Sequence, residues 1–443
     1  MLTPLGLWGR PGRYLYLNPL PPFTHCDPCR LRFHPSTSTK PGARTGLCYK
    51  LAIFVNPSIV HLITFISAFV SCMANDVGII NALQITCAMV LLTMKSHSFL
   101  IKLLLKFPFS FSIGEAVLII EGTLAFFCSV ITNCIINNDD IKNSSTFPQV
   151  LLLGVGIFLL ITSLKQEFQK LFPFTLIFLA IMVLLTFPLM FLVLKKNPII
   201  WLVVDLIFST TTRVLLIFYW AVCTVAALLI AWYFGGGSAP TKLTIMRKYF
   251  HGVVVAVYLP GVLLDSELLF TASVIALAAF LFLEAIRIYQ IDGLGSLLNS
   301  SMAGFLDEKD QGSIILTHIY LLVGCSLPVW MFPRSVASST EEVLLLCSGI
   351  ISLGVGDSAA SIGGSLFGRT KWPSSEKSLE GTACSIVAEM IFAVCLELGT
   401  FGNLNFPWVR YSSAAVVTSL VEAQTSQVDN LILPIVMYII LLI

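Results

Sequence analysis

Long apolar runs separated by short polar loops fill the chain from residue 51 to its end. A helix needs about 17–25 mostly apolar residues to cross a bilayer. The runs that meet this length well are 51–73, 77–95, 114–136, 147–164, 173–194, 213–234, 268–289, 313–332, 342–364 and 382–399, and the weaker or shorter runs are 98–112, 198–210, 250–264, 409–424 and 430–443. The pattern predicts an all-α polytopic membrane protein with about 10–15 transmembrane helices and no sizeable soluble domain.

Charge in the loops predicts which of them share one side of the membrane. The loop 235–249 carries lysine and arginine but no acid, which is typical of a cytosolic loop. Counting spans onward places further loops on that side, namely 290–312, 365–381 and 425–429, and the others on the opposite side, namely 265–267, 333–341 and 400–408. This assignment requires that 250–264 and 409–424 both cross the bilayer.

Composition supports a membrane protein and narrows its partners. Of 443 residues, 56% are hydrophobic and 11% are charged, and the mean hydropathy is +0.89, whereas soluble domains carry about 25% charged residues. The net charge of +2 gives no general attraction to nucleic acid. Residues 1–50 are rich in Pro, Arg and Thr and are predicted to be a disordered or atypical tail, and the lone Cys26–Cys29 pair is weak evidence for zinc.

The most polar segment between two apolar spans runs from Gly354 to Thr382. It is rich in glycine, contains Trp372, and concentrates six charged residues: Asp357, Arg369, Lys371, Glu376, Lys377 and Glu380. The basic residues suit a polyphosphate, although lysine and arginine alone also mark a cytosolic loop. Glycines let backbone approach a phosphate closely, and Trp372 suits either base stacking or anchoring at the membrane interface. We interpret this segment as a nucleotide site.

Two acids are candidates for holding a metal ion near this segment. Asp357 lies within the apolar run 342–364, where a carboxylate is costly unless it pairs with a lysine or binds a cation. Mg²⁺ prefers one or two carboxylates together with phosphate oxygens, so we expect Asp357 to be a ligand. Asp429, with Glu422 upstream and Asn430 beside it, would either reach the same cation or cap the last helix.

Other ionisable residues have simpler interpretations. Glu284 and Arg287 are three positions apart on one face of a predicted helix, and we expect them to pair. His318 lies in an apolar helix and is expected to be packed or hydrogen-bonded rather than catalytic. The chain contains no Walker A motif, kinase HRD or DFG set, HExxH or GxSxG elbow. A nucleotide would therefore be bound by an uncommon, membrane-embedded site.

The C-terminal half, roughly 240–443, resembles the polyprenol kinase family. The segments that carry the resemblance are RKYFHG, FLEAIRIY, FLDEKDQGSIILTHIYLLVGCSLPVWMF, GVGDSAASIGGSLFGRTKWPSSEKSLEGT and EAQTSQVDNLILP. The resemblance divides the chain into the tail 1–50, N-terminal transmembrane helices 51–239 and a CTP-transferase-like catalytic membrane domain 240–443. It implies a CTP-binding segment made of Ser365, Leu366, Phe367, Gly368, Arg369, Thr370, Lys371, Trp372, Pro373, Ser374, Ser375, Glu376, Lys377, Ser378, Leu379 and Glu380.

The resemblance also implies an activity. Members of the family transfer the γ-phosphate of CTP to the terminal hydroxyl of dolichol in the endoplasmic reticulum membrane, which makes the glycosyl carrier lipid for protein N-glycosylation. Similarity to membrane cytidylyltransferases implies that Asp357 and Asp429 hold Mg²⁺ or another divalent cation, while Lys377 contacts phosphate; these three are the expected catalytic residues. Glu376 stands where the family commonly has a lysine. The expected partners are dolichol, CTP and the lipid bilayer, with no nucleic acid.

Two other functions fit part of the pattern. A membrane cytidylyltransferase would make a CDP-lipid and release pyrophosphate instead of CDP. A polyisoprenoid or anion transporter would also place charges in interrupted helices. For the kinase, the acceptor of the hydroxyl proton is open between Asp357, Asp429 and Asp310.

Overall fold

The computed structural model describes residues 139–234, 240–302, 313–331, 339–373, 375–400, 406–425 and 429–443, together with isolated positions between 85 and 126. All of them belong to one compact unit, Pro57–Ile443. The expected tail 1–50, the span 51–73, all but two residues of the span 77–95, and the candidate base Asp310 lie outside the described residues.

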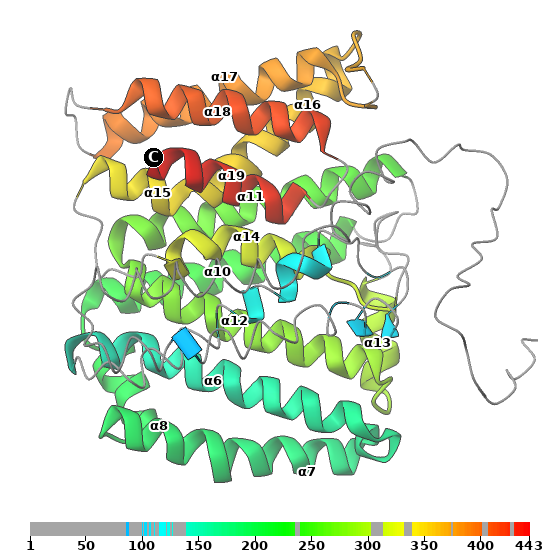
Figure 1. The fold of residues 1–443 in the computed structure, drawn as a ribbon, viewed down its shortest axis with the longest axis vertical. Coiled ribbons are helices and arrows are strands. Elements are labelled where there is room, and N and C mark those ends of the chain that lie inside the picture. The colour runs from blue at the N-terminus through cyan, green and yellow to red at the C-terminus, as the bar shows by residue number, and fades with distance from the viewer. Residues whose placement is uncertain are drawn as a thin grey trace, which may run out of the picture. The chain divides into compact units, whose positions relative to one another are not determined.

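The described chain is almost entirely helical, as the alternation of apolar runs and polar loops predicts (Figure 1). The long helices are α6 (Asp139–Leu164), α10 (Thr211–Phe234), α11 (Pro240–Leu264), α12 (Ser266–Ile288), α14 (Thr317–Met331), α17 (Leu379–Thr400), α18 (Trp408–Gln424) and α19 (Asp429–Leu442). Two more long helices contain a π-helical segment and are divided there: α7 (Leu171–Ile181), η2 (Met182–Thr186) and α8 (Phe187–Leu194), and α15 (Thr340–Gly349), η5 (Ile350–Asp357) and α16 (Ser358–Phe367).

Short helices complete the described chain: η1 (Gln166–Gln169), α9 (Pro198–Ile200), η3 (Trp201–Ile207) and α13 (Leu294–Met302). The ranges that the structure describes contain no β-strand, and only an isolated bridge joins Lys371 to Ser378. The prediction of an all-α polytopic membrane protein is therefore confirmed.

Six helical segments among the described residues are long and apolar enough to cross a membrane, and four shorter apolar helices lie beside them. Both segments on which the side assignment depended, 250–264 and 409–424, are parts of continuous helices, α11 and α18. Helices that follow one another in the chain therefore alternate in direction. In Figure 1 the loop between α16 and α17, the helix α13 and the start of α11 lie at one end of the helices, on the right, as loop counting predicts.

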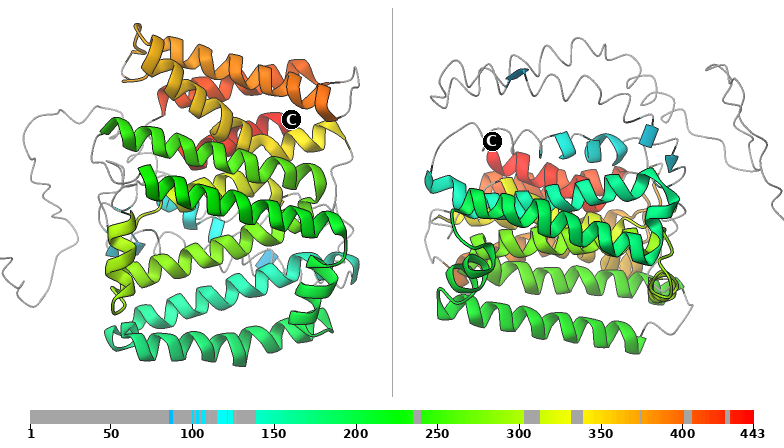
Figure 2. Two further views of the ribbon diagram at one scale, coloured as in Figure 1. Left: turned by 180° about the vertical axis from the view of Figure 1, so that it is seen from behind. Right: turned by 90° about the horizontal axis from the view of Figure 1, so that it is seen from below.

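The continuous helix α15–η5–α16 lies at the centre of the packing. In its most apolar window 78% of the residues are buried, compared with 11% for Thr211–Ile230 and 17% for Leu171–Leu194. The main hydrophobic core surrounds it with side chains from α11, α12, α14, α17, α18 and α19. The outer helices instead carry large exposed apolar side chains such as Phe172, Leu184 and Phe218, which suits contact with lipid. Figure 2 shows the same helices from behind and from below.

Glycines of the central helix allow close contact with its neighbours. A Cβ atom at Gly354 would lie 2.1 Å from Val255 on α11, and one at Gly363 would lie 2.4 Å from Cys384 on α17. Small residues let membrane helices approach closely, so these glycines serve helix packing. In the structure these two glycines allow the central helix to contact α11 and α17.

The expected pairing of Glu284 with Arg287 is present near the end of α12. Arg287 donates from Nε and Nη2 to the two carboxylate oxygens of Glu284 at 2.7 and 2.6 Å, and both residues are buried. The same pair binds the segment before α14, because Arg287 donates to the Ser313 carbonyl at 2.6 Å and the Ile315 amide donates to Glu284 at 2.7 Å. The ion pair therefore fixes where α14 begins.

Candidate functional site

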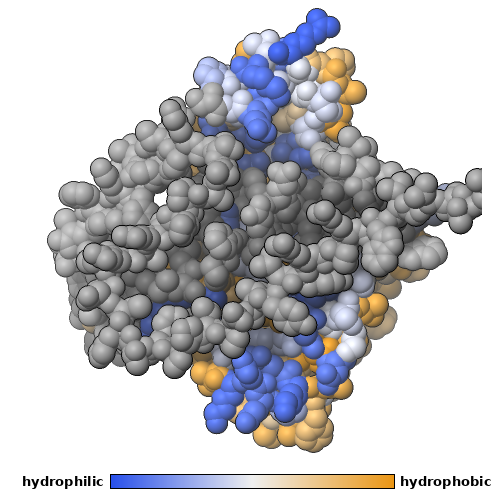
Figure 3. Space-filling view, turned by 90° about the vertical axis from the view of Figure 1, so that its right-hand side faces the viewer, coloured by the Kyte–Doolittle hydropathy of each residue, from blue (hydrophilic) through white to orange (hydrophobic). Residues whose placement is uncertain are grey.

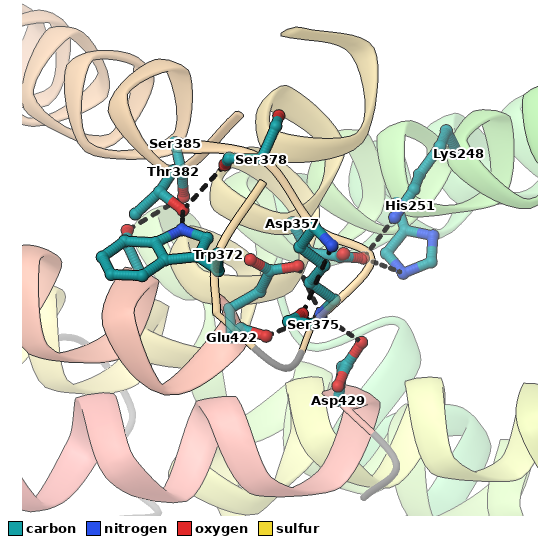
Figure 4. Close-up of polar contacts among 12 residues, drawn as sticks. Lys248, His251, Asp357, Trp372, Ser375, Ser378, Thr382, Ser385, Glu422 and Asp429 are labelled. Atoms are coloured by element: carbon teal, nitrogen blue, oxygen red, sulfur yellow. Dashed lines mark hydrogen bonds and ion pairs between the residues drawn. The ribbon is translucent and has the colours of Figure 1, made fainter. Parts of the chain in front are cut away.

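Asp357 is the last residue of the π-helical segment η5 and lies against the first half of α11. Its carboxylate accepts a hydrogen bond from Lys248 Nζ at 2.5 Å and lies 3.4 Å from His251 Nε2 (Figure 4). It is 8% exposed, so the ammonium group of Lys248 compensates a carboxylate that would otherwise be costly at this depth. Lys248 and His251 are three positions apart and so share a face of α11.

Asn430 links this pair to two other helices. His251 Nε2 lies 3.3 Å from Asn430 Oδ1 in α19, and Asn430 Nδ2 donates to the Thr317 carbonyl at the start of α14 at 3.4 Å. A side-chain amide that uses both its oxygen and its nitrogen has a defined orientation. Asn430 therefore holds the His251 ring in place beside Asp357.

Lys377 brings the polar loop to two further acids. Its Nζ lies 2.5 Å from Glu422 Oε1 at the end of α18 and 3.2 Å from Asp429 Oδ2 at the start of α19, and it donates to the Glu422 carbonyl at 2.7 Å. Burial alone would lower the pKa of Lys377, but attraction to Asp429 and Glu422 outweighs it, so the pKa lies above its ordinary value of 10.5. Lys377 is thus an ammonium ion held on carboxylates.

Asp357, Glu422 and Asp429 converge on one place although they come from three helices. One carboxylate oxygen from each lies within 4.8 Å of the others. The three carboxylates face two ammonium groups, Lys248 and Lys377. Figure 4 labels Lys248 and the three acids. Carboxylate oxygens are the ligands that Mg²⁺ prefers, and lysines suit phosphate. The residues present therefore fit a divalent cation together with a polyphosphate.

The loop between α16 and α17 is a small hairpin. Trp372 N donates to the Lys377 carbonyl at 3.0 Å, and Leu379 N donates to the Thr370 carbonyl at 2.9 Å. The Trp372 indole donates to Thr382 Oγ1 at 2.9 Å, and the Glu380 carboxylate accepts from Thr370 N at 3.1 Å. These contacts fasten both ends of the hairpin to the first turn of α17, which holds Lys377 toward the carboxylates.

The expected CTP-binding segment is divided among three elements. Ser365, Leu366 and Phe367 form the exposed end of α16, residues 368–378 form the hairpin, and Leu379 and Glu380 begin α17. Arg369, Lys371 and Glu376 are exposed on the hairpin, and Ser374 lies outside the described residues. Figure 3 shows hydrophilic residues gathered over the end of α16 and α17, and others over the end of α6 and α7, with hydrophobic flanks. The hairpin thus presents cationic groups at a polar end of the helices.

Sequence reasoning placed Asp357, Lys377 and Asp429 together, and the structure brings all three to one site. It missed the roles of Lys248, His251 and Glu422. The spacing of Lys248 and His251 on one helix face was an available signal, but nothing local pointed that face at Asp357. His318 contacts the Phe280 ring at 5.2 Å, which agrees with a packed histidine.

Apolar helices that bring three carboxylates, two of them buried, against two lysines at one end define a multi-pass membrane protein with a candidate site for a cation and an anionic ligand. The family model described as dolichol kinase matches residues 68–366, more than half of the chain, and the chain belongs to this family. The resemblance to polyprenol kinases is therefore confirmed. The matched residues also extend well into the N-terminal half, where the sequence alone offered no motif.

Individual relatives agree with the family model. The chain is 40% identical to the dolichol kinase of Bos taurus over 261 residues, which are 56% of this chain and 48% of that protein. It is 35% identical to the dolichol kinase of Homo sapiens over 370 residues, or 77% of this chain and 66% of that protein. It is 30% identical to the dolichol kinase EVAN of Arabidopsis thaliana over 377 residues, 76% of this chain and 65% of that protein. The chain thus spans about half to two thirds of these relatives, and no solved structure matches it.

Proposed function

We propose that this protein is a CTP-dependent dolichol kinase, which transfers the γ-phosphate of CTP to the terminal hydroxyl of dolichol and releases CDP and dolichyl phosphate. The observation that carries the proposal is the convergence of Asp357, Glu422 and Asp429 on Lys377 and Lys248 in a member of the dolichol kinase family. Phosphoryl transfer depends mainly on positioning and on neutralising charge, and this cluster supplies both. CTP as the donor rests on the family resemblance.

Each part of the site has a task in this reaction. Asp357, Asp429 and Glu422 would hold Mg²⁺ or another divalent cation, which supplies charge neutralisation for the phosphates. Lys377 leaves Glu422 and Asp429 and binds phosphate oxygens, because a triphosphate offers it a stronger anionic partner. The hairpin residues 365–380 bind the nucleotide. The dolichol hydroxyl arrives from the bilayer, between α12, α14 and the central helix.

The proposed function also implies where in the cell the protein acts. The hairpin, α13 and the start of α11 lie at the end of the helices for which loop charge predicts the cytosol, where CTP is available. We propose the endoplasmic reticulum membrane as the location and protein N-glycosylation as the process that uses dolichyl phosphate. The partners are then dolichol, CTP and the lipid bilayer, with no nucleic acid.

A kinase assay on membranes tests the proposal. Membranes containing the full chain are supplied with dolichol and γ-labelled CTP or ATP, and the labelled lipid is measured. We expect labelled dolichyl phosphate with CTP and its loss in Asp357→Asn. Asp205→Asn is the matched control, because Asp205 forms an exposed ion pair with Lys196 at 2.8 Å outside the site. Release of pyrophosphate with formation of a CDP-lipid would instead identify a cytidylyltransferase, and a wild-type rate in Asp357→Asn would refute the site.

A further inference from the structure

A buried carboxyl group on α17 lies next to the helix segment that carries Asp357, and it has no task in the proposed reaction. Glu389, on α17, is 1% exposed, and its Oε2 has no hydrogen-bond partner in the part of the chain that the structure describes. Burial of a polar group without a partner is unfavourable, and ionisable residues kept inside membrane helices usually have a function. The burial of Glu389 therefore requires an explanation.

Glu389 packs against the residue that precedes Asp357. A Cβ atom at Gly356 would lie 2.0 Å from Glu389 Oε1 and 3.0 Å from Ser385 Oγ. Non-bonded carbon and oxygen atoms do not approach to 2.0 Å, so the carboxyl group has room only because residue 356 is glycine. Gly356 and Glu389 thus form a matched contact between the π-helical segment η5 and α17.

The surroundings of Glu389 are fixed by α18. Tyr411, fully buried in α18, donates its hydroxyl hydrogen bond to the Glu389 carbonyl at 2.7 Å. One helical turn closer to the cluster, Ser419 Oγ in α18 lies 3.0 Å from Ser385 Oγ in α17. Both serines are 1% exposed. These contacts hold α17 against α18 at the level of Gly356. The helix that carries Glu389 is therefore fixed where its side chain contacts η5.

On the basis of the proposed function, we propose that Glu389 is a positioning residue for Asp357. Its carboxyl group fills the space that Gly356 leaves and fixes the end of η5, and that end presents Asp357 to Lys248, Glu422 and the nucleotide. Among the described residues no ion pair involves Glu389, and we assign its effect to the shape of the side chain.

Four variants of the full chain, purified in detergent, test this role. Glu389→Gln keeps the shape and is expected to retain activity. Glu389→Ala and Gly356→Ala are each expected to lower kcat/KM for CTP by about 10–100-fold, because small misplacements in a site cost this much. The double variant Gly356→Ala/Glu389→Ala is expected to recover part of the loss, because the new methyl group occupies the vacated space. Mn²⁺ affinity in the presence of CTP should follow the same order, with KM for dolichol unchanged.

A second acid on the same helix, which also has buried carboxylate oxygens, provides the control. Both carboxylate oxygens of Glu397 also lack a hydrogen-bond partner among the described residues, but Glu397 is two turns farther from the cluster, and Glu397→Ala should leave Mn²⁺ affinity unchanged. Equal losses in Glu389→Gln and Glu389→Ala, or no recovery in the double variant, would overturn the positioning role. A wild-type protein that neither binds Mn²⁺ with CTP nor phosphorylates dolichol would refute the proposed function itself.

Discussion

Replacing Lys377 with methionine is expected to uncouple cation binding from nucleotide binding. In the structure the Lys377 ammonium group lies 2.5 Å from Glu422 Oε1 and 3.2 Å from Asp429 Oδ2, among carboxylates that approach one another to within 4.8 Å. Under the proposed function, a divalent cation would compete with it for these carboxylates. A cation binding alone must displace this ammonium group, whereas a cation that arrives with a triphosphate gives Lys377 a new anionic partner.

Coulomb's law sets the size of the effect. Two unit charges 4 Å apart interact by about 4 kcal/mol at an effective dielectric constant of 20. The Lys377 side chain is 31% exposed and moves away when a cation binds. Its repulsion therefore weakens cation binding by only part of this Coulomb energy. We expect Lys377→Met to bind Mn²⁺ without nucleotide more tightly than the wild type by about 1–3 kcal/mol, or about 5–150-fold. Phosphoryl transfer should fall by roughly 100-fold or more, because a charge on the phosphates loses its partner.

Mn²⁺ titration of the purified protein, read by electron paramagnetic resonance with and without CTP, measures the coupling. The wild type should bind Mn²⁺ much more tightly with CTP, and this difference should shrink in Lys377→Met. Lys371→Met is the matched control, because the Lys371 ammonium group donates to the Glu376 backbone carbonyl and should not affect Mn²⁺ binding without nucleotide. Weaker Mn²⁺ binding in Lys377→Met than in the wild type would refute the reasoning.

Three further predictions follow from burial and charge. Arg287→Met leaves Glu284 buried and unpaired and should lower the free energy of unfolding by about 3–5 kcal/mol, measured by thermal denaturation in detergent; a loss below about 1 kcal/mol would contradict the role of the pair. Gly354→Ala should cost about 1–3 kcal/mol through contact with Val255, and Val255→Ala in the same chain should restore much of it. Because the pKa of Lys377 is raised above 10.5, its amine stays protonated until the pH exceeds that value. The difference in Mn²⁺ affinity between the wild type and Lys377→Met should therefore be constant from pH 7 to 9. A decline in this difference toward pH 9 would contradict the raised pKa.

Hydropathy determined most of the fold that the structure describes. The predicted runs 147–164, 173–194, 268–289 and 382–399 correspond to α6, α7–α8, α12 and α17 with ends that differ by a few residues, apart from a longer start in α6. An apolar helix must match the thickness of a bilayer, so its length is encoded locally. The pairing of Glu284 with Arg287 was predictable for the same reason, since positions three apart on a helix always share a face.

Only the tertiary structure decided which helix faces meet. It brought Glu422 from α18 and Lys248 from α11 to Asp357 and Lys377, and it placed Gly356 against Glu389. Such contacts join residues that are far apart in the chain, and they depend on how side chains of several helices interlock. The local pattern of polar and apolar residues predicts how deep in the membrane each charged group lies, but it does not predict which residues surround that group. For that reason it indicated a site in this loop and left the roles of Lys248, His251 and Glu422 unassigned.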